Sequence, residues 1–468
     1  GQVWKMLENK RIAMINLGCK ANKYEADAMT KKLIDANAKM VDAGEIADVY
    51  IVNTCSVTNI AEKKSRQMLR RAKKKNPKAV VAAVGCYVNA SKDEIADMDF
   101  VDLVIGNNCK KDIVEILQQY FTKSNPVQSY IDINCTNEYE EMGSLHFSSL
   151  NHQRAYIKIQ DGCNQFCSYC LIPYTRGRVR SRKPEHILNE ITQLAKEGVK
   201  EFVLTGIHIS SYGLDFVKTG IEYDERMNQD TTDLTMDLAS LVEAIEAIPE
   251  VKRIRLGSLE PRIITEKFLE RIGKCDKLCL HFHLSLQSAC NDTLKRMNRK
   301  YTIELFEEKC TLLRNFFDCP AITTDVIVGF PGETKEEIAT TVENLKRISL
   351  YEIHVFKYSI RSGTLAAKMP EQISENIKNE RSDILLELTS KQKKAYEDSY
   401  NGKMESVLVE EKISKENAKK LKQADLRIQE SEDTEREISY YTGHTRNYIK
   451  VAIASKKNIC NEIVDVVF

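Results

Sequence analysis

The segment Cys163-Asn-Gln-Phe-Cys-Ser-Tyr-Cys170 follows a β-prone run at Ala155–Gln160 and has the spacing Cys-x3-Cys-x2-Cys. Three thiolates at this spacing can hold three irons of a cubane iron–sulfur cluster and leave the fourth iron open for chemistry. A zinc site or a purely structural cluster is the alternative. Structural zinc normally needs four ligands, however, and no fourth Cys or His is close in the sequence. We therefore expect Cys163, Cys167 and Cys170 to bind a catalytic cluster.

Five further β-prone runs follow this segment, and helical patterns separate them. The runs are Phe202–Thr205, Arg253–Gly257, His281–Leu286, Ile322–Val328 and His354–Tyr358. The helical patterns are Pro184–Lys196, Leu234–Ala247, Thr265–Ile272, Thr302–Asn315 and Lys335–Arg347. Six βα units in one direction predict a partial parallel barrel over residues 149–379, with its active site at the C-terminal ends of the strands. The polar insertion Tyr212–Thr232 predicts a surface loop.

Strand and helix patterns also alternate before this core, over residues 10–122. The expected strands are Arg11–Leu17, Val49–Asn53, Ala79–Val84 and Leu103–Ile105. Helices are expected to begin near Asn22, Ser56 and Ser91, and a fourth covers Lys110–Tyr120. This alternation predicts an α/β domain built on an open parallel sheet.

One cysteine follows each of the first three strands of that sheet: Cys19, Cys55 and Cys86. An open α/β sheet builds its ligand site at this edge. Three ordinary buried cysteines are the alternative, because cysteine is among the most buried residue types. The equivalent positions of the three favour a shared site.

The chain after the core predicts a third, smaller unit over residues 398–468. A charged helical run at Glu371–Tyr400 leads to four β-prone segments that predict a small β-barrel. These segments are Glu405–Glu411, Ile438–Thr442, Tyr448–Ala454 and Ile463–Phe468. We expect the charged segment Lys412–Arg436 to be a solvated excursion and Ser124–Leu150 to be a connection.

The composition bounds the class of protein. A chain of 468 residues with 42% hydrophobic and 29% charged residues is typical of a soluble protein with several domains. No apolar stretch is long enough to span a membrane. Fourteen cysteines without a secretory signal indicate a reducing cytoplasm and metal or redox chemistry. We treat the remaining cysteines as structural: 109, 135, 275, 279, 290, 310, 319 and 460. Of these, Cys275 and Cys279 could mimic a metal pair.

The segment Cys163–Cys170 resembles the signature of radical S-adenosylmethionine (SAM) enzymes. In that family the open iron is chelated by the amino and carboxylate groups of SAM. One electron from the cluster then cleaves the sulfonium and yields a 5′-deoxyadenosyl radical. The resemblance implies that Tyr169, the aromatic residue of this segment, lies beside the adenine.

Three further motifs resemble the N-terminal motifs of the methylthiotransferases, a branch of that family. They are Asn16-Leu-Gly-Cys-Lys-Ala-Asn22, Val52-Asn-Thr-Cys-Ser-Val-Thr58 and Ala83-Val-Gly-Cys-Tyr87. The resemblance implies that Cys19, Cys55 and Cys86 hold an auxiliary cluster, so that the protein carries two 4Fe–4S clusters. This count suits the chemistry. Forming a C–SCH3 bond at an unreactive aromatic carbon needs a radical and a sulfur source, and three cysteines leave one iron free to hold sulfur.

Within the methylthiotransferases, three motifs most resemble the branch that acts on threonylcarbamoyladenosine in tRNA. They are Lys20-Ala-Asn22, Pro173-Tyr-Thr-Arg-Gly177 and Ser258-Leu-Glu-Pro261. The C-terminal barrel, with Gly443-His-Thr-Arg-Asn-Tyr448, is similar to the RNA-binding TRAM domain. One departure is Leu286-Gln-Ser-Ala-Cys290, where the family has Gly after the serine.

Several residues at expected strand ends are candidates for binding SAM. Thr205 and Gly206 resemble the family's methionine-binding loop; a plain turn is the alternative. Ser258, Ser285 and Gln287 could bond the ribose or the carboxylate. A close backbone approach is possible at Gly329-Phe-Pro-Gly332, because glycine permits it. Asp161, two residues before the cluster segment, either faces the substrate or caps the loop.

Basic residues predict the contacts with RNA, since the net charge of +1 requires them to be local. Candidates are Arg176, Arg178 and Arg180 after the cluster segment, and Arg446 and Lys450 in the C-terminal barrel. We expect tRNA, an electron donor of the flavodoxin or ferredoxin type, and no membrane as partners. Alternatives are methylthiolation of isopentenyladenosine or of a ribosomal protein side chain, and a non-catalytic RNA-binding iron–sulfur redox sensor.

Overall fold

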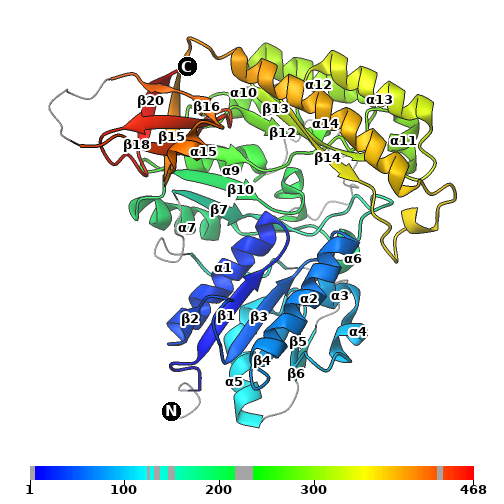
Figure 1. Ribbon diagram of the computed structural model, residues 1–468, viewed down its shortest axis with the longest axis vertical. Coiled ribbons are helices and arrows are strands. Elements are labelled where there is room, and N and C mark those ends of the chain that lie inside the picture. Colours follow the sequence, from blue (N-terminus) through cyan, green and yellow to red (C-terminus); the bar gives the residue numbers. More distant parts are fainter. Residues whose placement is uncertain (1–5, 124–126, 131–137, 146–152, 217–235, 429–435) are drawn as a thin grey trace.

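The computed structural model describes residues 6–123, 127–130, 138–145, 153–216, 236–428 and 436–468. Three units follow one another along the chain (Figure 1). A first α/β sheet lies at one end of the molecule, a larger α/β unit at the other, and a small β-barrel beside the larger unit. The α/β class expected from the sequence is confirmed. Cys135 and most of the insertion after Tyr212 lie outside the described residues.

The first sheet has six parallel strands in the order β2-β1-β3-β4-β5-β6. Helices pack on both faces, so β3 and β4 are buried along their whole length. The strands are β1 Arg11–Asn16, β2 Lys39–Val41, β3 Val49–Thr54, β4 Val80–Gly85, β5 Leu103–Ile105 and β6 Val127–Ser129. The helices are α1 Lys20–Asp35, α2 Asn59–Lys75, α3 Cys86–Ala90, α4 Lys92–Ala96 and α5 Ile113–Lys123.

Two edge strands of this sheet were not predicted. β2 is a three-residue strand whose side chains are partly exposed, so it has no apolar run. β6 lies inside the segment that we expected to be only a connection, and it pairs with β5 through Val127 and Ser129. Such short strands form because they pair in parallel with a buried neighbouring strand. This is a tertiary contact, which the local sequence does not predict.

The larger unit is built on six parallel strands, as expected. Two three-stranded ladders, β11-β10-β7 and β12-β13-β14, are joined by parallel bridges from Ile254 to Leu278 and from Leu259 to Leu284. The strands are β7 Arg154–Lys158, β10 Glu201–Thr205, β11 Arg253–Leu256, β12 His281–His283, β13 Ala321–Val328 and β14 Glu352–Lys357. The outer helices are α7 Pro184–Lys196, α9 Leu238–Glu246, α10 Glu266–Ile272, α11 Asn291–Arg296, α12 Ile303–Phe316 and α13 Lys335–Ile348.

A small hairpin frames the cysteine segment at the top of β7. β8 (Gln160–Asp161) pairs antiparallel with β9 (Arg180–Ser181), and the chain between them contains the three cysteines and the short helix α6 (Ile172–Thr175). The segment is therefore a closed loop, tied at its base by the hairpin.

The C-terminal unit is a six-stranded, nearly closed sheet in the order β16-β19-β18-β15-β20-β17. The long helix α14 (Glu375–Asp398) packs on β14 and leads into it. The strands are β15 Met404–Ile413, β16 Lys422–Gln423, β17 Asp425–Leu426, β18 Ser439–Thr445, β19 Lys450–Ser455 and β20 Ile463–Val467. The expectation that Lys412–Arg436 is only a solvated excursion was wrong: α15 (Lys415–Ala418), β16 and β17 lie in it and close the sheet.

In the described part of the chain, no helix is both long enough and apolar enough to cross a membrane.

Candidate active site

The loop of Cys163, Cys167 and Cys170 is held by its own backbone. The amide of Cys163 donates to the carbonyl of Gly177 over 3.0 Å. Amides at Gln165 and Ile172 donate to the sulfurs of Cys163 and Cys170, each over 3.4 Å. Burial raises the pKa of Cys163 to about 12, and burial together with the other two thiols raises that of Cys170. These thiols stay protonated until a metal replaces the proton.

Arg299 brings positive charge to this loop, and the sequence analysis missed it. Its guanidinium donates to the sulfur of Cys167 over 3.1 Å and to the carbonyl of Ser285 over 3.0 Å. A cation at this position favours the thiolate over the thiol. It also ties the cysteine loop to the end of β12.

Tyr169 belongs to an aromatic cluster above the strand ends. Its ring meets that of Phe330 edge-on, with 6.3 Å between the centroids, and Phe330 meets Tyr358 at 5.4 Å. Phe330 is part of the segment Gly329-Phe-Pro-Gly332 that the sequence analysis selected. The loop after β13 therefore packs directly against the cysteine loop.

Thr205 and Gly206 lie at the same rim, where β10 ends. The side-chain oxygen of Gln160 accepts from the amides of Ile207 over 3.1 Å and His208 over 2.7 Å. At Gly206 a Cβ atom would lie 2.8 Å from the carbonyl oxygen of Gln160, so only glycine allows this approach. The backbone of the turn is thus fixed against the strand that leads into the cysteine loop.

Ser258, Ser285 and Gln287 follow β11 and β12 at this rim. Ser258 is exposed, whereas Ser285 and Gln287 are half-buried. Gln287 has a φ of 76°, a left-handed conformation that is uncommon for a residue other than glycine. Its backbone amide donates to the carbonyl of Asp325 over 2.8 Å, which holds it there. Such strain is often found at ligand sites.

The cysteines of the first sheet also lie at one edge. Cys19 precedes α1 and is exposed, Cys55 follows β3 and Cys86 begins α3, both buried. Burial raises the pKa of Cys55 to about 11, and the nearby thiols of Cys86 and Cys19 add to the rise. At Gly18, with a φ of 99°, a Cβ would lie 2.9 Å from the Cys55 sulfur. Glycine therefore lets the first loop approach the second.

The segments that carry the two sets of cysteines meet where the first sheet contacts the larger unit (Figure 1). Helix α6, which closely follows Cys170, packs on α3, which begins at Cys86. The amide nitrogen of Asn107 donates to the Thr175 carbonyl over 2.9 Å and to the Cys86 sulfur over 3.5 Å. One side chain thus contacts both the first-sheet thiol and the segment that extends the cysteine loop.

A buried network of charges lies beside the first-sheet cysteines. Glu25 accepts from Lys158 over 2.6 Å, from Arg176 over 2.8 Å and also from Lys110. Four cations face two carboxylates in this network, all of them buried: Lys110, Lys158, Arg176 and Arg180 against Glu25 and Asp161. Burial also raises the pKa of the neighbouring Glu140 to about 7. Near neutral pH this carboxyl group is therefore only partly ionised and offsets only part of the positive charge of the network.

Part of the excess positive charge lies near the first-sheet cysteines, on Arg176. Burial alone would lower the pKa of Arg176, but Cys86, Glu25 and Asp161 raise it well above its usual value. A buried guanidinium needs nearby negative charge. Thiolates at Cys19 and Cys86 would supply that charge, so the network fits a metal-bound state of these cysteines.

Arg176 and Arg180 differ from what the sequence analysis expected, whereas Asp161 agrees with one of its two alternatives, a role in holding the loop. Asp161 is buried and accepts from the amide of Gly162 over 2.8 Å and from Lys158 over 2.7 Å. It therefore holds the base of the loop. Arg176 and Arg180 are each only 1% exposed, so in this structure they do not form a surface for phosphate. Of the three arginines, Arg178 is exposed, with its guanidinium 4.4 Å from the Phe166 ring centroid.

The spacing of the thiols favours a cluster over a single ion. Among the described residues, only His283, Asp325 and His354 bring three possible ligand atoms within 4.8 Å of one another. Thiolates around one zinc lie about 3.8 Å apart, because Zn–S bonds are about 2.3 Å long. Neither cysteine set is that compact. A cubane, with each iron bound by its own cysteine, suits the wider spacing.

Comparisons with known proteins agree with this geometry. Residues 157–345 match the radical SAM superfamily, and residues 11–106 match uncharacterized protein family UPF0004. The chain is 37% identical to the threonylcarbamoyladenosine tRNA methylthiotransferase MtaB of Bacillus subtilis, over 97% of this chain and 93% of the relative. This chain belongs to the tRNA methylthiotransferase family of radical SAM enzymes.

Other relatives carry a different substrate in their names. A tRNA-2-methylthio-N(6)-dimethylallyladenosine synthase of Clostridium botulinum is 33% identical over 84% of each chain. Among solved structures, the radical SAM methyltransferase TsrM of Kitasatospora setae has a TM-score of 0.54 over 77% of each chain, at 14% identity, and shares the fold. Membership of the family implies a 4Fe–4S cluster, SAM and a tRNA substrate for this methylthiotransferase.

The C-terminal barrel of the methylthiotransferase contacts the core through Arg446, one of the residues that we had expected to bind RNA. Arg446 donates to the carbonyls of Asp276 and Leu278, over 3.1 and 2.6 Å, and is partly buried. Lys450, at the start of β19, is exposed. Lys450 and Arg178 are therefore the expected RNA contacts that remain open to solvent.

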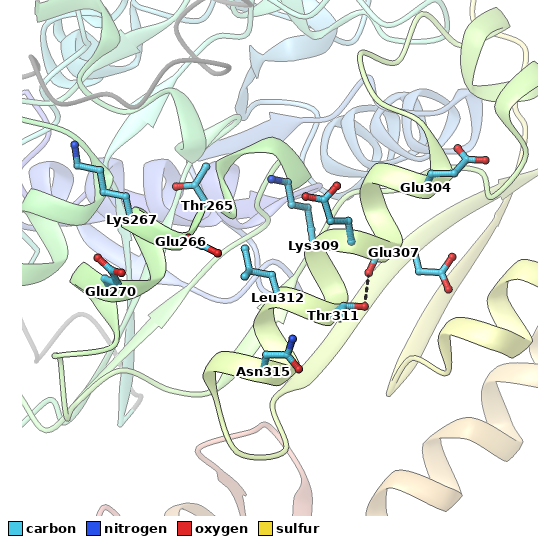
Figure 2. Close-up of a pocket in the computed structure, with 11 residues that line it drawn as sticks. Thr265, Glu266, Lys267, Glu270, Glu304, Glu307, Lys309, Thr311, Leu312 and Asn315 are labelled. Atoms are coloured by element: carbon cyan, nitrogen blue, oxygen red, sulfur yellow. Dashed lines mark hydrogen bonds between the residues drawn. The ribbon is translucent and has the colours of Figure 1, made fainter.

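A large hollow elsewhere on the enzyme has a different character. It encloses about 1060 Å³ between the outer faces of α10 and α12 (Figure 2). Five glutamates but only two lysines line it, together with four uncharged residues. This excess of acidic side chains disfavours an RNA phosphate there, and no cysteine of either set contributes to its wall.

Proposed function

We propose that this methylthiotransferase converts N6-threonylcarbamoyladenosine next to the tRNA anticodon to its 2-methylthio derivative, using two 4Fe–4S clusters. Support for the substrate is the relative with the corresponding name, which aligns along 97% of this chain. Support for two clusters is the second set of three cysteines with a surplus of buried cations beside it. The packing of α6 on α3 is the observation that carries the proposal, because it joins the two sets at one interface.

Each set of cysteines has its own role in the proposal. Cys163, Cys167 and Cys170 would hold the cluster that gives SAM an electron, and Cys19, Cys55 and Cys86 the cluster that offers sulfur. Arg299 and the Arg176 network keep positive charge on the two sets of thiolates. Tyr169, Thr205, Gly206, Ser258, Ser285 and Gln287 line the rim where SAM would bind. Asp161 holds the cysteine loop in position for catalysis.

The three units divide the work. Residues 10–122 would carry the auxiliary cluster, 149–379 the radical chemistry, and 398–468 the grip on tRNA through a TRAM-like barrel. Arg178 and Lys450 are the proposed phosphate contacts. An electron donor of the flavodoxin or ferredoxin type would reduce the first cluster. The tRNA substrate and the many thiols favour the cytoplasm.

The number of clusters is tested by iron analysis of the reconstituted protein. Two cubanes predict about eight irons per chain. Replacing Cys19, Cys55 and Cys86 together with alanine should halve this number, and so should replacing Cys163, Cys167 and Cys170. Unchanged iron after the first replacement would eliminate the auxiliary cluster.

The division of labour is tested with single variants. Cys163→Ala should abolish formation of 5′-deoxyadenosine. Cys55→Ala should still cleave some SAM but should form no methylthio product, because radical and sulfur come from different clusters. Normal product from Cys55→Ala would contradict the proposal.

The substrate is tested by nucleoside analysis of tRNA from a deletion strain. Loss of the methylthio group from threonylcarbamoyladenosine alone is the expected result. Loss of the methylthio group from isopentenyladenosine would identify that nucleoside as the substrate instead. Unchanged tRNA with an altered ribosomal protein would identify the protein as the substrate. A protein that binds RNA but never cleaves SAM when reduced would be a redox sensor instead.

A further inference from the structure

Lys20 differs from the buried cations around Glu25, Asp161 and Glu201, because no carboxylate of the described residues lies within hydrogen-bonding distance of its ammonium. Glu25 and Asp161 pair with the cations of the buried network, and Glu201 pairs with Arg154 and Arg255. In the described part of the chain, no hydrogen bond or ion pair reaches the Lys20 ammonium. It lies instead 5.1 Å from the centroid of the Tyr156 ring.

The place of Lys20 connects the two sheets. It directly follows Cys19 and is the first residue of α1, and α1 packs on β7. Tyr156 is the middle residue of β7, the strand that leads into the Cys163 loop. The side chain therefore extends from a residue next to Cys19 to the strand that leads into the Cys163 loop.

The backbone at Lys20 is firmly positioned. The side chain of Asn22 donates to the carbonyls of Leu17 and Thr54, over 2.7 and 3.0 Å, and the side chain of Asn53 donates to the carbonyl of Asn22 over 2.9 Å. Arg176 also donates to the Asn22 side chain, over 2.6 Å. These bonds fix the first turn of α1, so the lysine is presented from a rigid base.

Lys20 is exposed, and its surroundings suit an anion. The N-terminus of a helix carries partial positive charge and free backbone amides, and the first turn of α1 has no acidic residue. An anionic ligand here could bind both the ammonium and the helix end.

We propose that Lys20 binds the carboxylate of the threonylcarbamoyl group and so selects this substrate over a hydrocarbon-bearing one. The inference rests on the proposed function. A threonylcarbamoyl group ends in a carboxylate, whereas a dimethylallyl group offers no acceptor and would leave the ammonium unpaired. Lys20 therefore favours the first substrate and penalises the second.

The test compares two RNA stem-loops that carry threonylcarbamoyladenosine, one with its free carboxylate and one with the carboxylate as methyl ester. Wild-type enzyme should prefer the acid by about 10- to 100-fold in kcat/KM, the effect expected for one hydrogen bond to a charged group. Lys20→Gln should lose this preference by slowing on the acid alone, and Lys20→Arg should keep most of it. Lys23→Gln is the matched control, because Lys23 lies on the same helix and pairs with Asp27 over 3.0 Å.

Iron content and SAM cleavage without RNA separate this role from a structural one, and both should be equal in all variants. If wild-type enzyme prefers unmodified or dimethylallylated RNA, the proposed substrate and this inference both fail. Another outcome is that the wild type uses the acid while Lys20→Gln lowers kcat/KM equally on acid and ester, or does not lower it. In that case only the proposed role of Lys20 fails. Iron loss in Lys20→Gln alone would assign the residue to the cluster and likewise overturn the proposal.

Discussion

Glu25 shows how much of this site depends on one side chain. It lies in α1 and accepts from Lys110, Lys158 and Arg176, which come from three other segments of the chain. Burial would raise its pKa, but Arg176, Lys110 and Lys158 hold that pKa well below its usual value. The carboxylate is therefore ionised at neutral pH and, together with Asp161, offsets part of the positive charge of the network.

Glu25→Gln should destabilise the fold by about 3–5 kcal/mol at pH 7, because it leaves buried cations unpaired. Since the folded pKa is depressed, this stabilisation is complete above the unfolded pKa of about 4.3 and is lost as pH falls below it. Urea unfolding should show a constant difference from wild type between pH 7 and 5.5, and a smaller one near pH 3.5.

Glu45→Gln is the control, because Glu45 is exposed and its bridge to Arg11 is 3.8 Å long. Its effect should be within about 0.5 kcal/mol. An equal loss in Glu25→Gln at pH 7 and pH 3.5 would mean that Glu25 is not ionised in the folded protein.

At the level of single residues, the sequence marks the six cysteines as candidates but does not mark the residues around them. The thiols are recognisable because their spacing, or their place after a strand, is local. Glu25 and Lys158 are separated by 133 positions and Cys167 and Arg299 by 132, so no local pattern marks these pairs. For the same reason, Arg176 and Arg180 look like a solvated basic run although they are buried.

The closed cysteine loop depends on one backbone position. Gly162 has a φ of 74°, and a Cβ there would lie 1.9 Å from the carbonyl oxygen of Arg178. Gly162→Ala should force the two arms of the hairpin apart and displace Cys163, so about half of the iron and all SAM cleavage should be lost. Backbone strain alone costs about 1–3 kcal/mol, and the clash adds to it.

Gly44→Ala should leave iron and SAM cleavage unchanged, because nothing lies within 4 Å of the added methyl group. Circular dichroism should be the same for both variants. Full iron in Gly162→Ala would show that the loop tolerates a wider hairpin.

At the level of elements, long periodic segments are predictable and short ones are not. α7 begins and ends where the sequence indicates, and all six strands expected in the core are present. β16 and β17 have two residues each, and α11 has six, so none carries a period long enough to read. β16 and β17 are defined instead by pairing with the distant strands β19 and β20.

In the whole molecule, the C-terminal barrel is anchored to the bottom of the core by Tyr448. Its ring stacks with those of His281 and His444, with centroids 5.0 and 4.3 Å away, and the Arg255 guanidinium lies 4.7 Å from its centroid. Tyr448→Ala should loosen this contact by about 3–5 kcal/mol, the usual cost of removing a packed aromatic ring.

Limited proteolysis at the exposed turn between α14 and β15 should therefore become faster in Tyr448→Ala. Tyr440→Ala, half-buried on β18, should be cleaved at nearly the wild-type rate. Equal cleavage of both variants would mean that the ring does not hold the barrel in place.

The grip on tRNA is a property of the whole molecule, because the proposed phosphate contacts lie on two units. Each phosphate contact on a duplex lowers log affinity by about 0.9 per log unit of salt. Arg178→Ala and Lys450→Ala should each weaken binding to all tRNAs alike and make this salt dependence shallower by about that amount. Lys391→Ala, 74% exposed on α14, is the control and should do neither.

Discrimination should come instead from the base that enters between the two sets of cysteines. Transfer RNA without the threonylcarbamoyl group should bind with the same salt dependence, since it offers the same phosphates, but should react poorly. The measurement is affinity and single-turnover rate on the same RNA pair. A large loss of affinity for the unmodified RNA would mean that the base, not the backbone, carries binding, and equal rates on both RNAs would refute the substrate assignment.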